Sequence, residues 1–265
     1  MDGAEISGSK ASPQRENILG IGVSVIDMSR ALETIQGWID RDARHYVCVT
    51  GVHGLMVSQG SSELRAIHNA AGMITPDGMP VAWLLRLAGH RKARRVCGPD
   101  LMPAVMIASQ ARGDRHFLYG ATDDTLAKLR RGLLDQAPDA QIVGSHSPPF
   151  RALTSEEGAA IVDLINAAKP DVVWVGLSTP KQEYWMAKHR ARLTAPVLIG
   201  VGAAFDVHAG LSTRAPALMQ ACGLEWLYRV AREPRRLWWR YLWNNPRFVA
   251  LIALQKAGLY RPGAL

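Results

Sequence analysis

The chain has 265 residues and a net charge of +8, with 48% apolar and 20% charged residues, an ordinary composition for a globular protein. This length fits one main domain with an appendage. Its three cysteines are odd in number and far apart (Cys48, Cys97 and Cys222), which argues against a disulfide framework or a cysteine metal site and favours a reducing compartment. No uninterrupted apolar stretch reaches 18 residues, so we predict no transmembrane span.

The N-terminal region is polar over residues 1–17 and lacks an apolar signal-peptide core, so we expect a disordered tail. A strand is predicted over 18–27, and a helix over 29–43 with Ser29 as its N-cap. The short β-branched run 45–50 predicts a second strand, which leads into a turn and a short helix.

Farther along, helices and strands alternate regularly. Strands are predicted at 115–121, 140–145, 171–177 and 195–202, and helices at 98–113, 122–138, 154–170 and 179–193. A Thr154/Glu157 capping box opens one helix, and Pro180 lies near the first turn of another. Apolar strands between amphipathic helices predict an α/β, Rossmann-like fold, whose parallel sheet is covered by helices on both faces.

The alternation stops near residue 222, and a basic, tryptophan-rich helical stretch follows. Residues 225–265 contain eight basic and two acidic residues, a net charge of +6, which leaves about +2 for the rest. We therefore divide the chain into a tail (1–17), an α/β catalytic domain (18–222) and a helical appendage (223–265). The charge predicts an anionic partner for the appendage, either nucleic acid or an acidic membrane surface.

Ligands of such folds bind beyond the carboxyl ends of the strands, here the loops at Thr50, Gly120, 176–182 and 200–206. The segment GVGAAF lacks the third glycine of a dinucleotide fingerprint, and no P-loop motif is present. An oxidoreductase or P-loop enzyme is therefore poorly supported. The DRD sequence at 40–42 mimics a metal-binding D-x-D, but it ends an amphipathic helix and is interpreted as a solvated face.

Asp77 lies between Pro76 and Gly78, just before an apolar run with helical spacing. An acid in this position is commonly a helix cap, because it accepts backbone N–H bonds. The flanking residues also fix the loop and allow close approach of a ligand, so Asp77 is equally a candidate general base.

Two further loops join strand ends to helix starts. In the stretch 178–185, exposed N–H groups suit a diphosphate, and Gln182 can reach a base or a phosphate. Lys181 and Glu183 are equally well explained as helix surface. The glycine-rich stretch 200–210 allows a ligand to lie close to its backbone, and Asp206 can bind ribose hydroxyls or cap a turn.

Arg95 is a candidate partner of phosphate, although a lone arginine more often forms a surface ion pair. His53 is a candidate contact of the acceptor, with a satisfied structural histidine as the alternative.

Together these motifs resemble the WecG/TagA/CpsF glycosyltransferase family. The resemblance runs from about residue 18 to about 250 and rests on TPDGMPVAWLLRLAGHRKARRVCGPDLMP, GLSTPKQEYW and PVLIGVGAAFDVHAGLSTRAPALMQACGLEWLYRVAREPRRLWWRYLWNN. It implies a bacterial enzyme that moves a sugar from a UDP-sugar to a sugar on a polyprenyl diphosphate, with inversion and without a metal or other cofactor.

By motif position, Asp77 matches the family's proposed general base and Thr50 a threonine of the same site. The resemblance also implies a UDP site that contains Arg95, Gln182, Gly202 and Asp206, with His53 and Lys181 as acceptor or donor contacts.

The segment YVCVTGVHGLM is most similar to the GumM-type branch, which builds exopolysaccharide repeat units, so we expect UDP-glucose as donor. The alternative donor is UDP-N-acetylmannosamine or its uronate. Many members carry an asparagine two residues after the threonine, and Val52 stands there in this chain.

The resemblance makes the appendage a membrane-docking element at the cytoplasmic face of the bacterial inner membrane. Tryptophan prefers the headgroup level, and basic residues are attracted to anionic lipids. The expected contacts with membrane or diphosphate are Arg229, Arg232, Arg236, Arg240, Trp238 and Trp239. The alternative is that these helices pack on the core. A remote alternative is that the chain is a nucleic-acid-binding protein. The resemblance also implies self-association as a homo-oligomer.

Overall fold

The computed structural model describes residues 12–262, without the side chains of Arg236 and Arg240. Residues 1–11 of the expected tail lie outside the described residues. The predicted tail boundary at residue 17 falls inside a strand, β1 (Arg15–Ile18).

The first predicted strand, 18–27, is wrong as a single strand. β1 pairs antiparallel with β2 (Ile21–Ser24) in a separate hairpin. Leu19 and Gly20 form its two-residue turn with positive φ angles of 52° and 81°, which suits the right-handed twist of a hairpin. The turn breaks the apolar run, and this explains the difference from the prediction.

The main sheet has six parallel strands in the order β4-β3-β8-β7-β5-β6. They are β3 (His45–Thr50), β4 (Met73–Pro76), β5 (Arg115–Gly120), β6 (Gln141–His146), β7 (Val172–Gly176) and β8 (Val197–Gly200). Every strand of this sheet predicted from the sequence is present. Only β4, too short for a clear pattern, had no prediction.

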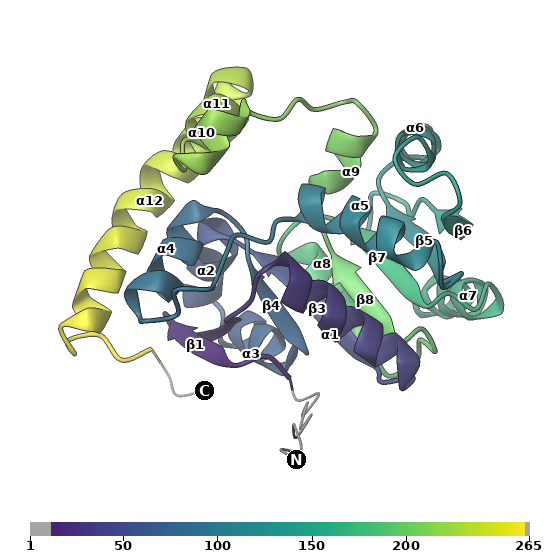
Figure 1. The fold of residues 1–265 in the computed structure, drawn as a ribbon, viewed down its shortest axis with the longest axis horizontal. Coiled ribbons are helices and arrows are strands. Elements are labelled where there is room, and N and C mark those ends of the chain that lie inside the picture. Colours follow the sequence, from purple (N-terminus) through teal and green to yellow (C-terminus); the bar gives the residue numbers. More distant parts are fainter. Residues whose placement is uncertain (1–11, 263–265) are drawn as a thin grey trace, which may run out of the picture.

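Helices cover both faces of the sheet, as predicted (Figure 1). One face carries α2 (Val52–Gln59), α3 (Ser62–Ala70), α4 (Met79–Leu87), α7 (Ser155–Ala167) and α8 (Lys181–His189), and the other carries α1 (Met28–Asp40), α5 (Gly98–Ser109), α6 (Asp123–Leu134) and α9 (Ala204–His208). Along β7, Val173 and Val175 face the first core while Val172 and Trp174 face the second, as the alternation of side chains in a strand requires.

Two helix caps test the sequence analysis. Asp27, not Ser29, caps α1, because its side chain accepts a 2.9 Å hydrogen bond from the amide of Arg30. The Thr154/Glu157 capping box of α7 is confirmed, with bonds of 3.2 and 2.9 Å.

The C-terminal stretch forms α10 (Ala217–Ala221), α11 (Glu225–Arg232) and α12 (Pro234–Lys256). Figure 1 shows α12 along one side of the molecule, next to α2 and α4. Its C-terminal half packs on the α/β unit: Phe248 is buried, and the Gln255 side chain accepts from Leu19 N and donates to Asn17 O. Within residues 12–262, none of the helices is long and apolar enough to cross a membrane.

Candidate active site

Four of the candidate loops follow neighbouring strands. β4, β3, β8 and β7 are adjacent in the sheet, so their carboxyl ends form one continuous edge. Gly54 lies close to two of these loops, since a Cβ on it would lie 2.9 Å from Thr50 Cγ2 and 3.8 Å from Thr179 Cγ2. The Asp77, Thr50 and 178–182 regions therefore meet at one edge.

Asp77 directly follows β4 and lies beside the end of β3. Its N–H donates a 3.1 Å hydrogen bond to the carbonyl of Thr50. Gly78, with φ 92°, is the N-cap of α4, and no side chain caps this helix. The cap interpretation of Asp77 is therefore wrong, and its partly buried carboxyl group is available for chemistry.

Charged groups from distant segments surround Asp77. Burial raises its pKa above the ordinary value, and Glu225 acts in the same direction. Arg229 and Arg95 oppose this effect, because their positive charges favour the carboxylate. Two of the predicted diphosphate contacts therefore lie within electrostatic reach of the predicted base.

Arg95 belongs to an ion network that joins α5, α10 and α11. It donates to Glu225 at 2.7 Å and to Asp100 at 3.3 Å, with its side chain 12% exposed. Glu225 also accepts a 2.9 Å bond from Arg229. Arg95 therefore does not form an isolated surface ion pair but belongs to a largely buried ion network.

Arg214 and Gln220 complete this network, which we call the arginine network: Arg95, Asp100, Arg214, Gln220, Glu225 and Arg229. Arg214 donates to Asp100 at 2.5 Å, and Gln220 accepts from both Arg95 and Arg214. The three guanidinium groups of this network are the groups here that could bind an anionic ligand. The sequence analysis missed Asp100, Arg214, Gln220 and Glu225, because their partners lie up to 130 positions away.

Thr50 is 2% exposed, and its hydroxyl lies 3.1 Å from Nε2 of buried His68 on α3. The other ring nitrogen of His68 lies 2.9 Å from the carbonyl of Leu64, so Nδ1 donates there. Burial lowers the pKa of His68, and the neutral ring then accepts from Thr50 through Nε2. The sequence analysis missed His68, which no motif marks.

Gln182 and Glu183 lie at the start of α8 and are 2% and 0% exposed. Glu183 Oε1 accepts from Thr179 at 2.9 Å and from Gln182 Nε2 at 3.2 Å. The helix-surface interpretation is wrong for Glu183, which is buried, whereas Lys181 is exposed, as expected of a surface residue. Gly202 lies beside Gln182: a Cβ on it would be 3.5 Å from Gln182 Oε1.

Asp206 and His53 lie at the margins of this edge. Asp206 is exposed on α9, and its backbone carbonyl accepts the N–H groups of Leu211 and Ser212, as expected of a turn residue. His53 on α2 lies 3.4 Å from Asn244 of α12, which brings the appendage to the rim of the site.

The remaining predicted contacts on the appendage differ in exposure. Trp238 and Trp239 are 57% and 68% exposed, and Trp239 stacks on Trp243 with ring centroids 6.1 Å apart. Arg232 is exposed and lies over the ring of Tyr228. The side chains of Arg236 and Arg240 lie outside the part of the chain that the structure describes.

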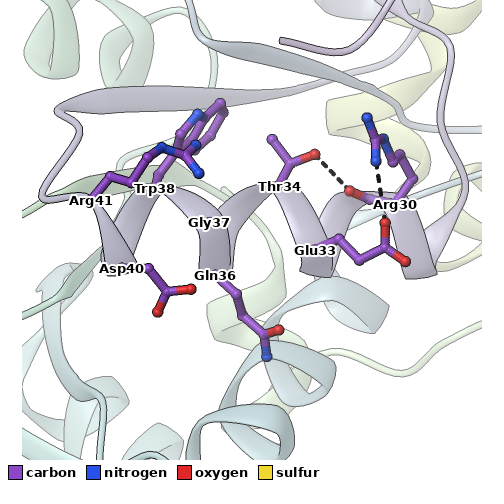
Figure 2. Close-up of a pocket in the computed structure, with 8 residues that line it drawn as sticks. All are labelled: Arg30, Glu33, Thr34, Gln36, Gly37, Trp38, Asp40 and Arg41. Atoms are coloured by element: carbon purple, nitrogen blue, oxygen red, sulfur yellow. Dashed lines mark hydrogen bonds and ion pairs between the residues drawn. The ribbon is translucent and has the colours of Figure 1, made fainter. Parts of the chain in front are cut away.

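A separate hollow of about 280 Å³ lies along α1, lined by residues of that helix and by its C-cap residue Arg41 (Figure 2). Arg30 in it pairs with Glu33 at 3.3 Å, and Asp40 pairs with Arg112 at 2.5 Å. None of the predicted site residues lines this hollow, and we assign no chemistry to it. Over residues 12–262, no three His, Cys, Asp or Glu side chains group closely enough to hold a metal ion.

Comparison with known proteins covers nearly the whole chain. Residues 16–262 match the model of a family described as "Glycosyl transferase WecG/TagA/CpsF family". The chain is 29% identical over 198 residues to an N-acetylglucosaminyldiphosphoundecaprenol N-acetyl-beta-D-mannosaminyltransferase of Bacillus spizizenii, covering 75% of this chain and 74% of that protein. It is 24% identical over 249 residues to a Staphylococcus aureus protein of the same name, covering 93% and 95%.

Proposed function

Because the chain belongs to the WecG/TagA/CpsF glycosyltransferase family, we propose that it transfers N-acetylmannosamine from its UDP-sugar to N-acetylglucosaminyl-diphosphate-polyprenol. The relatives from Bacillus and Staphylococcus are named for that sugar and that acceptor. They favour this alternative over the UDP-glucose expected from the GumM-type motif, and we therefore propose it as the donor.

One observation carries the proposal: Asp77 is held through its backbone N–H by the carbonyl of Thr50, and its carboxyl group lies within the electrostatic reach of Arg95 and Arg229. A base and a cationic anion site are the two parts that an inverting transfer from a nucleotide sugar requires. Both lie beyond the carboxyl ends of parallel strands, where ligands of this fold class bind.

In the proposed reaction, Asp77 accepts the proton of the acceptor hydroxyl. The hydroxyl oxygen forms a bond to the anomeric carbon, the bond from that carbon to the UDP oxygen breaks, and UDP leaves with the electron pair. Attack from the face opposite UDP inverts the anomeric centre. Arg95 and Arg229 stabilise the charge that develops on the diphosphate.

The appendage fits an acceptor that is held in a membrane. Exposed Trp238, Trp239 and Trp243 lie on a basic helix, and such a surface favours the headgroup region of anionic lipids. We propose peripheral attachment at the cytoplasmic face of the membrane. Whether the product belongs to an exopolysaccharide depends on which donor and acceptor sugars the enzyme uses.

The test is UDP release by the purified full chain, with EDTA present. The donors are the UDP derivatives of N-acetylmannosamine, its uronate, glucose and N-acetylglucosamine. The acceptors are short-chain prenyl diphosphates that carry N-acetylglucosamine or glucose. We expect turnover only with N-acetylmannosamine and the N-acetylglucosamine acceptor.

Turnover with UDP-glucose and the glucose acceptor alone would overturn the donor assignment and restore the GumM-type expectation. Loss of activity in EDTA, restored by a divalent cation, would contradict a metal-free transfer. The absence of UDP binding in calorimetry would contradict the nucleotide-sugar reaction itself.

A further inference from the structure

The side-chain amide of Gln182 is hydrogen-bonded through its nitrogen and unpaired at its oxygen. Its Nε2 donates to Glu183 Oε1 at 3.2 Å, whereas its Oε1 has no hydrogen-bond partner among the described residues. The residue is 2% exposed, so this oxygen is an acceptor withdrawn from solvent. Buried polar atoms are rarely left unpaired, which points to a ligand that donates to it.

Glu183 determines which end of the amide faces the site. A carboxyl oxygen that already accepts from Thr179 at 2.9 Å stabilises an N–H group and repels a carbonyl oxygen. The reversed amide would place Gln182 Oε1 against Glu183 Oε1, two acceptors face to face. Glu183 is fully buried, so water cannot relieve that repulsion.

Two glycines keep the space around the amide. A Cβ on Gly200 would lie 3.1 Å from Gln182 Cδ, so any larger residue would press on the side chain. Gly202 has a φ of 52°, and its missing Cβ would lie 3.5 Å from the free Oε1. The close approach of β8 and its loop to the amide therefore depends on glycine at these positions.

We propose that Glu183 is a positioning residue, which holds the Gln182 amide with its oxygen toward the ligand. Gln182 then recognises a hydrogen-bond donor of the nucleotide and not its diphosphate, because phosphate oxygens only accept at neutral pH. Uridine offers two kinds of donor, the imide N–H of its base and the two free hydroxyls of its ribose. This inference rests on the proposed use of a UDP-sugar.

The test is calorimetric binding of UDP to the wild-type chain and to Gln182→Met, which has a similar size but no acceptor. We expect Gln182→Met to bind UDP about tenfold more weakly, the usual scale of one lost hydrogen bond. N3-methyl-UDP and 2′- and 3′-deoxy-UDP identify the donor. The analogue that lacks this donor should bind the wild type about tenfold more weakly than UDP does. The same analogue should bind Gln182→Met as tightly as UDP does.

The role of Glu183 is tested with Glu183→Met and Glu183→Gln. Glu183→Met removes the acceptor that fixes the amide, and we expect about the same tenfold loss of UDP affinity. Glu183→Gln keeps an oxygen for Thr179 and Gln182, so it should bind nearly as the wild type does. In a Gln182→Met background, Glu183→Met should cause no further loss, whereas a merely structural role would weaken binding in both backgrounds.

The inference is overturned if UDP binds the wild type and Gln182→Met equally, or if every analogue binds the wild type as tightly as UDP. It is also overturned if the losses from Gln182→Met and Glu183→Met simply add. Failure of the wild type to bind UDP at all would instead remove the proposed function.

Discussion

Asp77 is positioned mainly by its backbone. Its N–H is bonded to Thr50 O, and its carbonyl oxygen lies where a Cβ on Gly51 would come within 2.7 Å. Gly78 then turns the chain with a positive φ that favours glycine. The carboxyl group is therefore presented at the sheet edge by a loop with little freedom to move.

Asp77→Asn should lower kcat by about 10²- to 10⁴-fold, because the amide cannot take the acceptor proton. UDP binding and the unfolding temperature should stay close to wild type. Turnover assays with calorimetry test this prediction, with exposed Asp163→Asn on α7 as the control. Full turnover by a folded Asp77→Asn would exclude Asp77 as the base.

The pH profile follows from the same carboxyl group. Burial raises the pKa of Asp77 above 3.8, and only the deprotonated form can act as base. The acid limb of kcat/KM should therefore lie above pH 3.8, with activity falling as pH decreases through it.

Gly51→Ala should reduce kcat/KM by about 100-fold, the scale expected when a reacting group is displaced by an ångström. Its Cβ would meet the Asp77 carbonyl at 2.7 Å, so the loop must shift. Gly60→Ala is the matched control at the other end of α2, because its Cβ would lie 3.6 Å from the nearest atom, an ordinary contact. Equal kinetics for the two variants would refute the packing argument.

At the scale of elements, α11 completes the surroundings of Asp77 although it follows in sequence long after the α/β unit. Glu225 on this helix holds Arg95 with one oxygen and Arg229 with the other, at 2.7 and 2.9 Å. The side chain of Glu225 is 19% exposed and that of Arg95 is 12% exposed, so solvent screens their pair only in part. The ion pairs of Glu225 thus connect α11 with Arg95 and the surroundings of Asp77.

Glu225→Gln should lower the free energy of unfolding by about 2 kcal/mol, because bonds to charged partners are among the stronger ones. Protease cleavage near α11 should become faster. Glu33→Gln removes an exposed pair of α1 and should change stability by less than about 0.5 kcal/mol. Urea unfolding compares the two, and equal stabilities would mean that the network does not hold α11.

α12 has two different halves. Its C-terminal half is packed through Phe248 and Gln255, while Trp238, Trp239 and Trp243 in the N-terminal half are mostly exposed. The packed alternative of the sequence analysis therefore applies to the C-terminal half, and the exposed tryptophans of the N-terminal half are the surface proposed for membrane contact.

Replacing Trp238, Trp239 and Trp243 together by serine should weaken binding to phosphatidylglycerol vesicles by at least about tenfold, since their apolar area no longer enters the interface. Flotation of vesicles measures this. Phe150→Ser removes an aromatic residue that is 88% exposed in a distant loop, and it should bind as the wild type does. Vesicle binding by the triple variant at wild-type strength would contradict membrane docking through this face.

For the whole molecule, buried histidines link stability to pH. Burial lowers the pKa of His116 to about 4, and Trp174 Nε1 donates to its Nδ1 at 3.2 Å. Protonation of Nδ1 must break that bond. The folded state therefore binds fewer protons than the unfolded state between the unfolded pKa of about 6.5 and pH 4.

Stability should be fully present above pH 6.5 and fall as pH decreases toward 4, with about 3 kcal/mol lost through His116. Urea unfolding across this range measures the loss. His116→Asn offers Trp174 an oxygen near the Nδ1 position but does not titrate, so its stability should depend less on pH. The same slope in both proteins would show that His116 does not set the acid response.

The sequence predicted the repeating part of the fold well. Strands such as β3 and β7 and helices such as α7 were predicted from the apolar pattern and the capping residues within each segment. The hairpin at Leu19–Gly20 was missed because its turn interrupts an otherwise apolar run. Asp77, Thr50 and Gln182 were found because they follow strands or begin helices, where parallel sheets bind ligands.

By itself, the sequence determined the sheet with helices on both faces, the loops at its carboxyl edge and the basic appendage, since each depends on periodicity, glycines or charge along the chain. Only the tertiary structure decided what surrounds those loops. It placed Glu225 between Arg95 and Arg229, His68 behind Thr50 and Glu183 against Gln182. The contacts of Glu225 with Arg95 and of His68 with Thr50 join separate elements, and the inward direction of Glu183 depends on how α8 packs on the sheet. Their cause is the close packing of the folded chain, which no local pattern encodes.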